Sequence, residues 1–247
     1  MTAIAGRRGI KVDLEAFDRM GRETPVLVDL KPSGSNYMED LYKAGGLGPI
    51  LRELQPLLHL DCKTVSGRTL GEEVEQAPLW EQDIVKSIRA PLKSEGGIAV
   101  LKGNLAPETA IIKQSAATPE LLVHEGRAVV FESLEDLADR IDHPDLEVEK
   151  DDILILRNAG PRGGPGMPES GYIPIPKKLA ARGVKDMVRM SDARMSGTAF
   201  GTIVLHICPE AAVGGTLSLV QNGDRIRLDV PSRRLDLLVD SPLLAVR

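Results

Sequence analysis

Two loops hold most of the residues in this sequence that could do chemistry. The first, GPRGGPGMPE at residues 160–169, has four glycines, three prolines and a single carboxylate, Glu169. Glycine allows positive φ and close approach of a ligand, and proline stiffens the chain, so we expect a rigid, concave loop that holds its acid in place. Such a carboxylate can ligate a divalent cation. The alternatives are a plain connection, or a glutamate that starts a helix.

The second loop, SDARMSGT at residues 191–198, places two serines, a threonine and an arginine around one glycine. Together the two loops form the candidate catalytic site. The alternative interpretation is structural, because serines such as Ser191 and Ser196 often do no more than bond turn amides.

Composition narrows the class of protein. The 247 residues are 42% hydrophobic and 27% charged, with a net charge of -5 and no apolar run near 18 residues. We therefore expect neither a membrane span nor a nucleic-acid surface. The first six residues are short and small and are followed by Arg7 and Arg8. This start does not resemble a signal peptide, which favours the cytoplasm.

The cysteines and histidines do not form a metal motif. Cys62 and Cys208 are the two cysteines, and neither belongs to a CxxC pair. They are expected to be reduced thiols, and they are too few for a complete zinc or iron-sulfur site. The four histidines lie outside HxxxH and HExxH spacing, so each is expected to be structural.

The first 75 residues are predicted to be mainly helical. Leu14 and Phe17 begin one short amphipathic helix, Val26–Leu30 is expected to be a brief strand, and Gly45–Gly46 ends a further helix. Thr69 and Glu72 have the spacing of a capping box. The apolar faces of these helices need a partner.

Short strands dominate from Gly96 onward, after an ordered connector. The expected strands are Gly97–Leu101, Ala128–Phe131, Ile153–Leu156, Met187–Met190 and Thr202–Cys208. A hairpin is predicted from Leu217–Gln221 and Arg225–Val230 around Asn222–Gly223–Asp224. Helices are expected to start at Ser133 and Pro176, the second closing at Gly183. Regularly spaced strands with few helices predict a barrel or sandwich.

Four motifs resemble one enzyme family. They are PSGSNYMEDLYKAGG (32–46), LKGNLAP (101–107), GPRGGPGMPE (160–169) and VRMSDARMSGTAFGTIVLHICPEAAVGG (188–215). Together they resemble the dihydroxy-acid, phosphogluconate and aldonate dehydratases. The resemblance implies an α+β chain: a helical remnant of an incomplete α/β domain (1–80), a connector (81–95), a C-terminal β-barrel domain with peripheral helices (96–240) and a tail (241–247).

The resemblance also implies a reaction and its cofactors. A 2,3-dihydroxy acid would lose water to give a 2-keto-3-deoxy acid, with a 2Fe-2S cluster and Mg²⁺ as cofactors. Glu169 corresponds to a magnesium ligand and Ser196 to the catalytic base. A serine is a poor base, so it needs concentrated positive charge nearby. Thr198 could orient Ser196 or the substrate.

Other residues of these motifs receive weaker assignments. Arg194 could offset charge and bind substrate, and Lys102 and Asn104 could line the same cleft and bind substrate as well. Asn104 could equally stabilise a turn, and Asp192 could equally bond loop amides.

The resemblance places the cluster cysteines and the remaining magnesium ligands in an N-terminal region that this sequence does not contain. Neither Cys62 nor Cys208 corresponds to a cluster ligand. One carboxylate cannot build a strong magnesium site. We therefore expect the chain alone to be inactive and to need the N-terminal half, or a partner chain carrying it. Self-association is also expected.

The substrate class is less tightly specified. SDARMSGTAFGT and HICPEAAVGG are more similar to the arabinonate and xylonate dehydratases than to the branched-chain amino-acid enzymes, which favours a small sugar acid. Two alternatives remain: a dihydroxy-acid dehydratase, and a non-catalytic module for small-acid binding or assembly.

Overall fold

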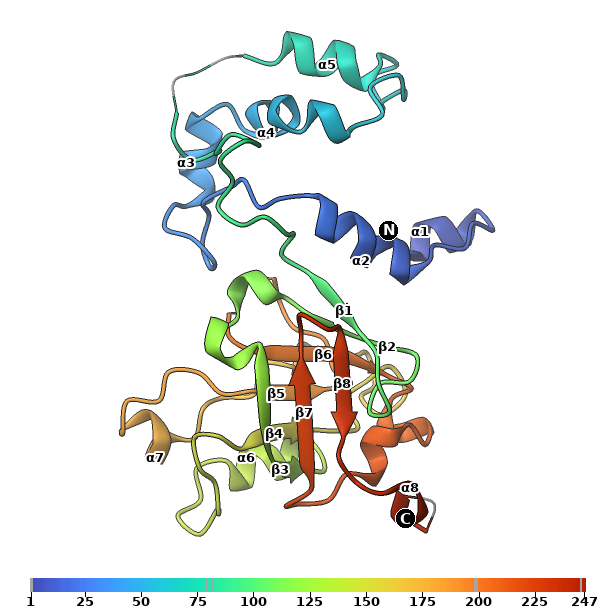
Figure 1. Ribbon diagram of the computed structural model, residues 1–247, viewed down its shortest axis with the longest axis vertical. Coiled ribbons are helices and arrows are strands. Elements are labelled where there is room, and N and C mark those ends of the chain that lie inside the picture. Colours follow the sequence, from blue (N-terminus) through green and yellow to red (C-terminus); the bar gives the residue numbers. More distant parts are fainter. Residues whose placement is uncertain (1, 79, 81, 198–199, 245) are drawn as a thin grey trace. The chain divides into compact units, whose positions relative to one another are not determined.

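The computed structural model describes every residue except 1, 79, 81, 198, 199 and 245 (Figure 1). The chain divides into two compact units, Met1–Gly97 and Ile98–Arg247. In the described residues, no helix combines the length and the apolar character that a membrane crossing requires.

The first unit is mainly helical, as the sequence predicts. Its helices are α1 (Thr2–Arg7), α2 (Leu14–Glu23), α3 (Met38–Lys43), α4 (Leu47–Glu53) and α5 (Leu70–Gln76), with a 3₁₀ turn at Gln55–Leu57. The capping box at α5 is confirmed: Glu72 N donates to Thr69 Oγ1 at 3.2 Å, and Thr69 N donates to Glu72 Oε2 at 2.6 Å. Both bonds satisfy amides that the first helical turn leaves open.

The strand expected at Val26–Leu30 is present only as isolated bridges. Val26 pairs with Lys93 and Val28 pairs with Val85. The connector therefore folds back on the first unit, and its residues Ile84 and Val85 join Leu27, Leu41 and Ala44 in a small core. An apolar run predicts an extended segment. It does not reveal that the neighbouring segment is irregular and pairs with it at single residues only.

Several large apolar side chains of the first unit remain exposed. Helix α2 has no buried residue. Tyr42 of α3 is 81% exposed, and Val65 is fully exposed. Ile4, Ile10, Met38 and Leu47 are exposed as well. This small core does not cover the apolar faces of its helices.

The second unit is built on one sheet. Its strands are β1 (Ala99–Leu101), β2 (Thr109–Ile112), β3 (Val123–Phe131), β4 (Ile153–Leu156), β5 (Arg189–Ser191), β6 (Ile203–Cys208), β7 (Arg225–Asp229) and β8 (Arg234–Leu237). They lie in the order β1-β2-β6-β5-β4-β3-β7-β8. The pairs from β3 through β4 and β5 to β6 are parallel, and the others are antiparallel.

The two edges of this sheet meet just beyond β1. Lys102 N donates to Arg233 O at 3.0 Å, and Leu235 N donates to Lys102 O at 3.1 Å. The sheet is therefore a nearly closed barrel, which confirms the predicted α+β class (Figure 1). Closure satisfies backbone groups that an open sheet leaves at its edges.

Both faces of the parallel strands are buried. Val130 and Ile155 point into the barrel with Met190 and Val204. Phe131 and Leu156 point outward and pack with Leu137 of α6 (Leu134–Arg140) and Leu179 of α7 (Lys177–Ala180). The expected helix starts are confirmed, since α6 follows Ser133, whose Oγ accepts from Asp136 N at 3.2 Å, and α7 follows Pro176. Gly183, just after α7, has a φ of 88°.

The predicted hairpin at residues 217–230 is wrong in its first arm. Thr216–Leu219 is a 3₁₀ turn, and β7 pairs instead with β3 and β8. Asn222 does not turn one strand into the next: its Oδ1 accepts from Val130 N at 2.7 Å and so caps the neighbouring strand β3. The second arm is confirmed, because Ile226 and Leu228 are buried.

The C-terminal segment is packed on the barrel and is not a free tail. Helix α8 (Ser241–Leu244) follows β8. The Arg247 guanidinium pairs with Asp224, and its Nη2 lies 3.0 Å from Asp224 Oδ1. This ion pair holds the pKa of Asp224 below its ordinary value, against the opposing effect of partial burial.

Candidate functional site

The two chemically rich loops leave adjacent parallel strands. Residues 160–169 follow β4, residues 191–198 begin at the end of β5, and Leu156 is in register with Ser191. Carboxyl ends of neighbouring parallel strands meet at one edge of a sheet, which is where α/β proteins commonly bind ligands. The topology therefore brings both loops to the same end of the barrel.

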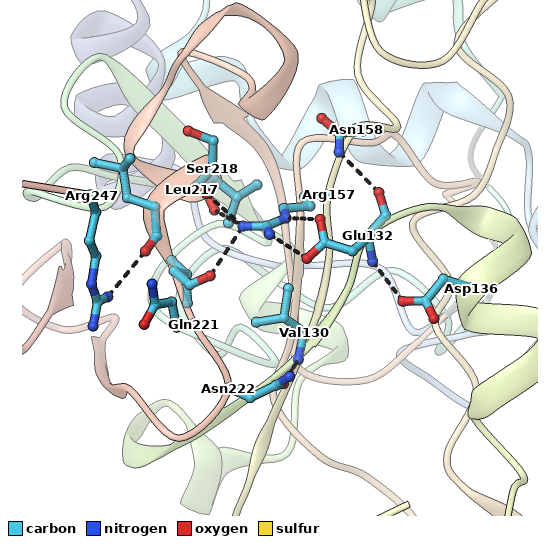
Figure 2. Close-up of polar contacts among 12 residues, drawn as sticks. Val130, Glu132, Asp136, Arg157, Asn158, Leu217, Ser218, Gln221, Asn222 and Arg247 are labelled. Carbon is cyan, nitrogen blue, oxygen red and sulfur yellow. Dashed lines mark hydrogen bonds and ion pairs between the residues drawn. The ribbon is translucent and has the colours of Figure 1, made fainter.

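Arg157 fixes the start of the first loop (Figure 2). Its Nη1 donates to the carbonyl oxygens of Ser218 at 2.6 Å and Val220 at 3.1 Å, and its Nε donates to Glu132 Oε2 at 2.7 Å. Asn158 Nδ2 donates to Glu132 O at 3.0 Å. All three side-chain nitrogens of Arg157 donate hydrogen bonds, so the backbone is held firmly and the loop leaves the barrel in a defined direction.

Asp192 joins both loops to a third segment. Its side chain is 1% exposed, and it accepts from the backbone N–H groups of Asn158 (3.2 Å), Ala159 (3.0 Å) and Ala211 (2.9 Å). The sequence allowed Asp192 to bond loop amides, and the structure shows these bonds. A buried carboxylate with three amide donors is a structural anchor.

Glu210 holds the glycine-rich segment in a similar way. Its oxygens accept from Arg162 N (2.9 Å) and Gly163 N (3.0 Å). A Cβ on Gly160 would lie 2.6 Å from Glu210 Oε2, so glycine is needed there for the close approach. The first part of the loop is therefore held by the Glu210 carboxylate.

Arg194 connects the predicted metal ligand to the second loop. Its Nη1 lies 2.7 Å from Glu169 Oε1, and its Nε donates to Met167 O at 2.7 Å. Gly171 N donates to Arg194 O at 2.9 Å. Ser196 follows two residues later and is half-buried. The structure thus brings Glu169 and the serine-bearing loop together, while Thr198 lies outside the described residues.

A buried ion pair holds the far end of the second loop. Arg189 is 2% exposed, and its Nη2 lies 2.8 Å from Asp186 Oδ1. Asp186 also accepts from Thr202 N at 2.9 Å and from Thr202 Oγ1 at 2.8 Å. Thr202 follows the loop in the sequence, so these bonds anchor the segment that comes after it.

Lys102 and Asn104 lie along β8. Asn104 uses both ends of its amide on Leu237, as Nδ2 donates to Leu237 O at 2.8 Å and Leu237 N donates to Oδ1 at 2.6 Å. These two bonds fasten the segment after β1 to β8. Lys102 is exposed, and its backbone pairs with β8.

Sequence reasoning missed three polar residues next to the loops: Glu108, Glu210 and His206. Glu108 directly follows the LKGNLAP motif, and its backbone N–H donates to Cys208 O at 3.2 Å. His206 N donates to Ala193 O at 3.1 Å, which ties β6 to the second loop. Desolvation and the nearby Arg194 lower the pKa of His206. The HICPE sequence contains two of the three, but its spacing matches no catalytic motif.

Cys208 is held as a neutral thiol. Its Sγ donates to Glu108 Oε2 at 3.0 Å. Burial, followed by the bond to Glu108 and the charges of Glu108 and Glu210, raises the pKa of Cys208 to about 11.

We therefore expect slow alkylation of Cys208 at pH 8 in a Cys62→Ser background, because only the thiolate reacts. A shift from 9.0 to about 11 reduces the thiolate about 100-fold. The more basic thiolate is more nucleophilic, so the net rate should be roughly tenfold below that of an exposed peptide cysteine. The rate should keep rising until the pH passes about 11. Iodoacetamide labelling followed by mass spectrometry measures this, and a rate that levels off below pH 9 would contradict it.

The described residues do not complete a metal or cluster site. They contain no group of three or more His, Cys, Asp or Glu side chains placed to hold a metal ion. Glu169 offers one carboxylate, which is paired with Arg194. Mg²⁺ prefers several oxygen ligands and a cluster needs several thiolates, so this donor set fits neither group by itself.

Family models match both units of the chain. Residues 83–247 match the model described as dihydroxy-acid/6-phosphogluconate dehydratase C-terminal, and residues 1–73 match its N-terminal counterpart. The chain belongs to the dihydroxy-acid/6-phosphogluconate dehydratase family. Members of this family are hydro-lyases, and the two loops around Glu169 and Ser196 lie in two of the four motifs by which the chain resembles them.

Individual dehydratases are similar over the whole chain. The L-arabinonate dehydratase of Rhizobium leguminosarum bv. trifolii is 51% identical over 100% of this chain and 43% of that protein. The 6-deoxy-6-sulfo-D-gluconate dehydratase of Pseudomonas putida is 48% identical with the same coverage. The dihydroxy-acid dehydratase of Methanothrix thermoacetophila is 42% identical, over 100% of the chain and 45% of that protein. The chain therefore spans less than half the length of these dehydratases.

Proposed function

We propose that this chain provides the C-terminal part of a hydro-lyase that dehydrates a sugar acid to its 2-keto-3-deoxy acid. The supporting observation is the contact of Arg194 with Glu169, which joins the two family loops at one end of the barrel. The relatives named for arabinonate and sulfogluconate, at 51% and 48% identity, favour a sugar acid over a branched-chain dihydroxy acid.

In this proposal, each loop contributes one functional group. Ser196 removes the proton from C2, which is weakly acidic beside the carboxylate, and the C3 hydroxyl leaves as water. The enol that results tautomerises to the 2-keto-3-deoxy acid. Glu169 would contribute one oxygen ligand to the Mg²⁺ that the family resemblance implies beside a 2Fe-2S cluster, and the other ligands would come from residues outside this chain. Thr198 orients Ser196 or the substrate, and Arg194 supplies positive charge within two residues of the base. Lys102 and Asn104 remain proposed substrate contacts at the cleft, as does Arg194.

The proposal includes a partner. Because the described residues offer neither the remaining magnesium ligands nor cluster thiolates, we expect this chain alone to be inactive. The exposed apolar side chains of α2 and α3 suit a protein surface, either the N-terminal region of a dehydratase or a second copy of the chain. We propose the cytoplasm as the location of this assembly.

A complementation assay tests the proposal. The 247-residue chain is mixed with a separately expressed, cluster-loaded N-terminal portion of the L-arabinonate dehydratase, and formation of 2-keto acid is measured. We expect turnover of L-arabinonate or D-xylonate in the mixture only, with 2,3-dihydroxyisovalerate a poorer substrate. Preferred turnover of 2,3-dihydroxyisovalerate would instead support a dihydroxy-acid dehydratase. If the two parts bind each other but turn over none of these acids, a non-catalytic module becomes the better account.

A further inference from the structure

A cavity of about 410 Å³ opens directly beside the two loops. Met167 of the first loop and Asp192 of the second line it, together with the end of β6 and the residues that precede β2. Its volume is that of a small-molecule site. Nothing in the roles given to Glu169 and Ser196 uses this cavity, although Met167 O is bonded to the arginine that pairs with Glu169.

Residues that line the cavity have polar atoms with unused hydrogen-bonding capacity. Thr109 Oγ1 is buried and has no hydrogen-bond partner among the described residues. An orphaned hydroxyl is costly, and Oγ1 would reach a ligand in the cavity only after a rotation about χ1, which would also satisfy it. Glu108 uses Oε2 for the Cys208 thiol, and within the described chain Oε1 has no such partner. The His206 backbone has a φ of 53°.

Charge and shape restrict what the cavity can take. Asp192 and Glu210 also line it, but their oxygens are occupied by backbone amides. Three carboxylates repel an anionic group, which disfavours a phosphate, a sulfonate or a second carboxylate. Ile207 and Val213 offer apolar walls for C–H groups. The ligand that matches this lining best is an uncharged carbon chain with hydroxyl groups. Its hydroxyls would donate to Glu108, and its CH groups would pack on the apolar walls.

We propose that this cavity is the subsite for the uncharged, hydroxylated tail of the substrate acid, with Glu108, Thr109 and His206 as its polar contacts. This inference rests on the proposed dehydration of a sugar acid. It identifies the hydroxylated tail as the part of the substrate by which the enzyme selects it. The carboxylate end of the acid lies at the Glu169 and Arg194 side, and the tail extends toward β2 and β6.

Binding to the full 247-residue chain tests the subsite without turnover. L-Arabinonate and 2,3-dihydroxyisovalerate are titrated separately while backbone amide resonances are followed by NMR. We expect L-arabinonate to shift the amides of Glu108, Thr109 and His206, and 2,3-dihydroxyisovalerate to leave them unchanged. Glu108→Gln and Thr109→Val should each weaken arabinonate binding roughly tenfold, because a ligand hydroxyl loses its partner. Thr109→Ser keeps the hydroxyl and should bind like the wild type.

Glu120→Gln is the matched control, since Glu120 is exposed and lies outside the cavity. Unchanged amides far from the cavity show that a variant is folded. Absence of arabinonate shifts at the cavity, or equal shifts with 2,3-dihydroxyisovalerate, overturns the subsite. If the complemented mixture is active, Glu108→Gln must also reduce the preference for L-arabinonate over 2,3-dihydroxyisovalerate at least tenfold, and an unchanged preference overturns the subsite while the dehydratase proposal stands. If the mixture is inactive, the binding result decides alone.

Discussion

Replacing Ser196 by alanine is expected to reduce kcat of the complemented dehydratase about 10³-fold, because the proton at C2 then lacks its base. This loss corresponds to about 4 kcal/mol of activation free energy. Ser196 is half-buried in a loop that other side chains hold, so the variant should fold normally. The measurement is 2-keto acid formation at saturating sugar acid, with KM determined in parallel.

Ser232→Ala is the matched control for Ser196→Ala. Ser232 is exposed in the turn between β7 and β8, outside the two loops. Its replacement should leave kcat unchanged. If Ser196→Ala retains more than a tenth of the wild-type kcat, the assignment of Ser196 as the base is wrong.

Replacing Asp192 by alanine should destabilise the barrel unit by about 3–5 kcal/mol, since three buried backbone donors lose their acceptor. The carboxylate is 1% exposed and bonds Asn158, Ala159 and Ala211. A loss of this size should lower Tm by roughly 10 °C or more. Asp192→Asn should cost less, because one oxygen still accepts while its NH₂ opposes a backbone donor.

Thermal unfolding followed by circular dichroism measures the Asp192 series. Asp145→Ala serves as the control, because the Asp145 side chain is 92% exposed and should contribute little. If Asp192→Ala and Asp145→Ala unfold at the same temperature, Asp192 does not anchor the loops.

Local sequence signals predicted the strands and helices that depend on nearby residues. The capping box of Thr69 and Glu72 is present, and the run Ile153–Leu156 is β4. The outward and inward sides of β7 follow the alternation of Ile226 and Leu228 with charged residues. Each signal acts over a few residues, so the sequence itself contains it.

Features that depend on distant partners were not predictable from local patterns. Asn222–Gly223 has the form of a hairpin turn, yet the Asn222 side chain accepts a hydrogen bond from Val130 N, 92 positions away. Glu108 meets Cys208 across 100 positions, which no spacing motif records. The strands β2 and β8 are short. The pairing of β2 with β6 and of β8 with β7 becomes evident only from the closed sheet.

In the candidate site, too, local signals were predictive and long-range contacts were not. Glycine, proline and serine content singled out the two loops, and their motifs led to Glu169 and Ser196. The sequence offered the bonding of Asp192 to loop amides only as one alternative and gave no signal for Glu210, because a carboxylate that binds backbone amides has no characteristic spacing. Arg194 was assigned to charge balance, and the structure adds that its partner is Glu169.

The most direct test of the central claim, that the two loops form one site, is a double substitution in the complemented enzyme. Glu169→Gln, Ser196→Ala and the combined variant are compared by kcat in the same mixture. Residues that act as a unit are not additive, so the account predicts that the double variant is about as slow as the slower single variant. If the two losses multiply, Glu169 and Ser196 act independently and the single-site account is contradicted.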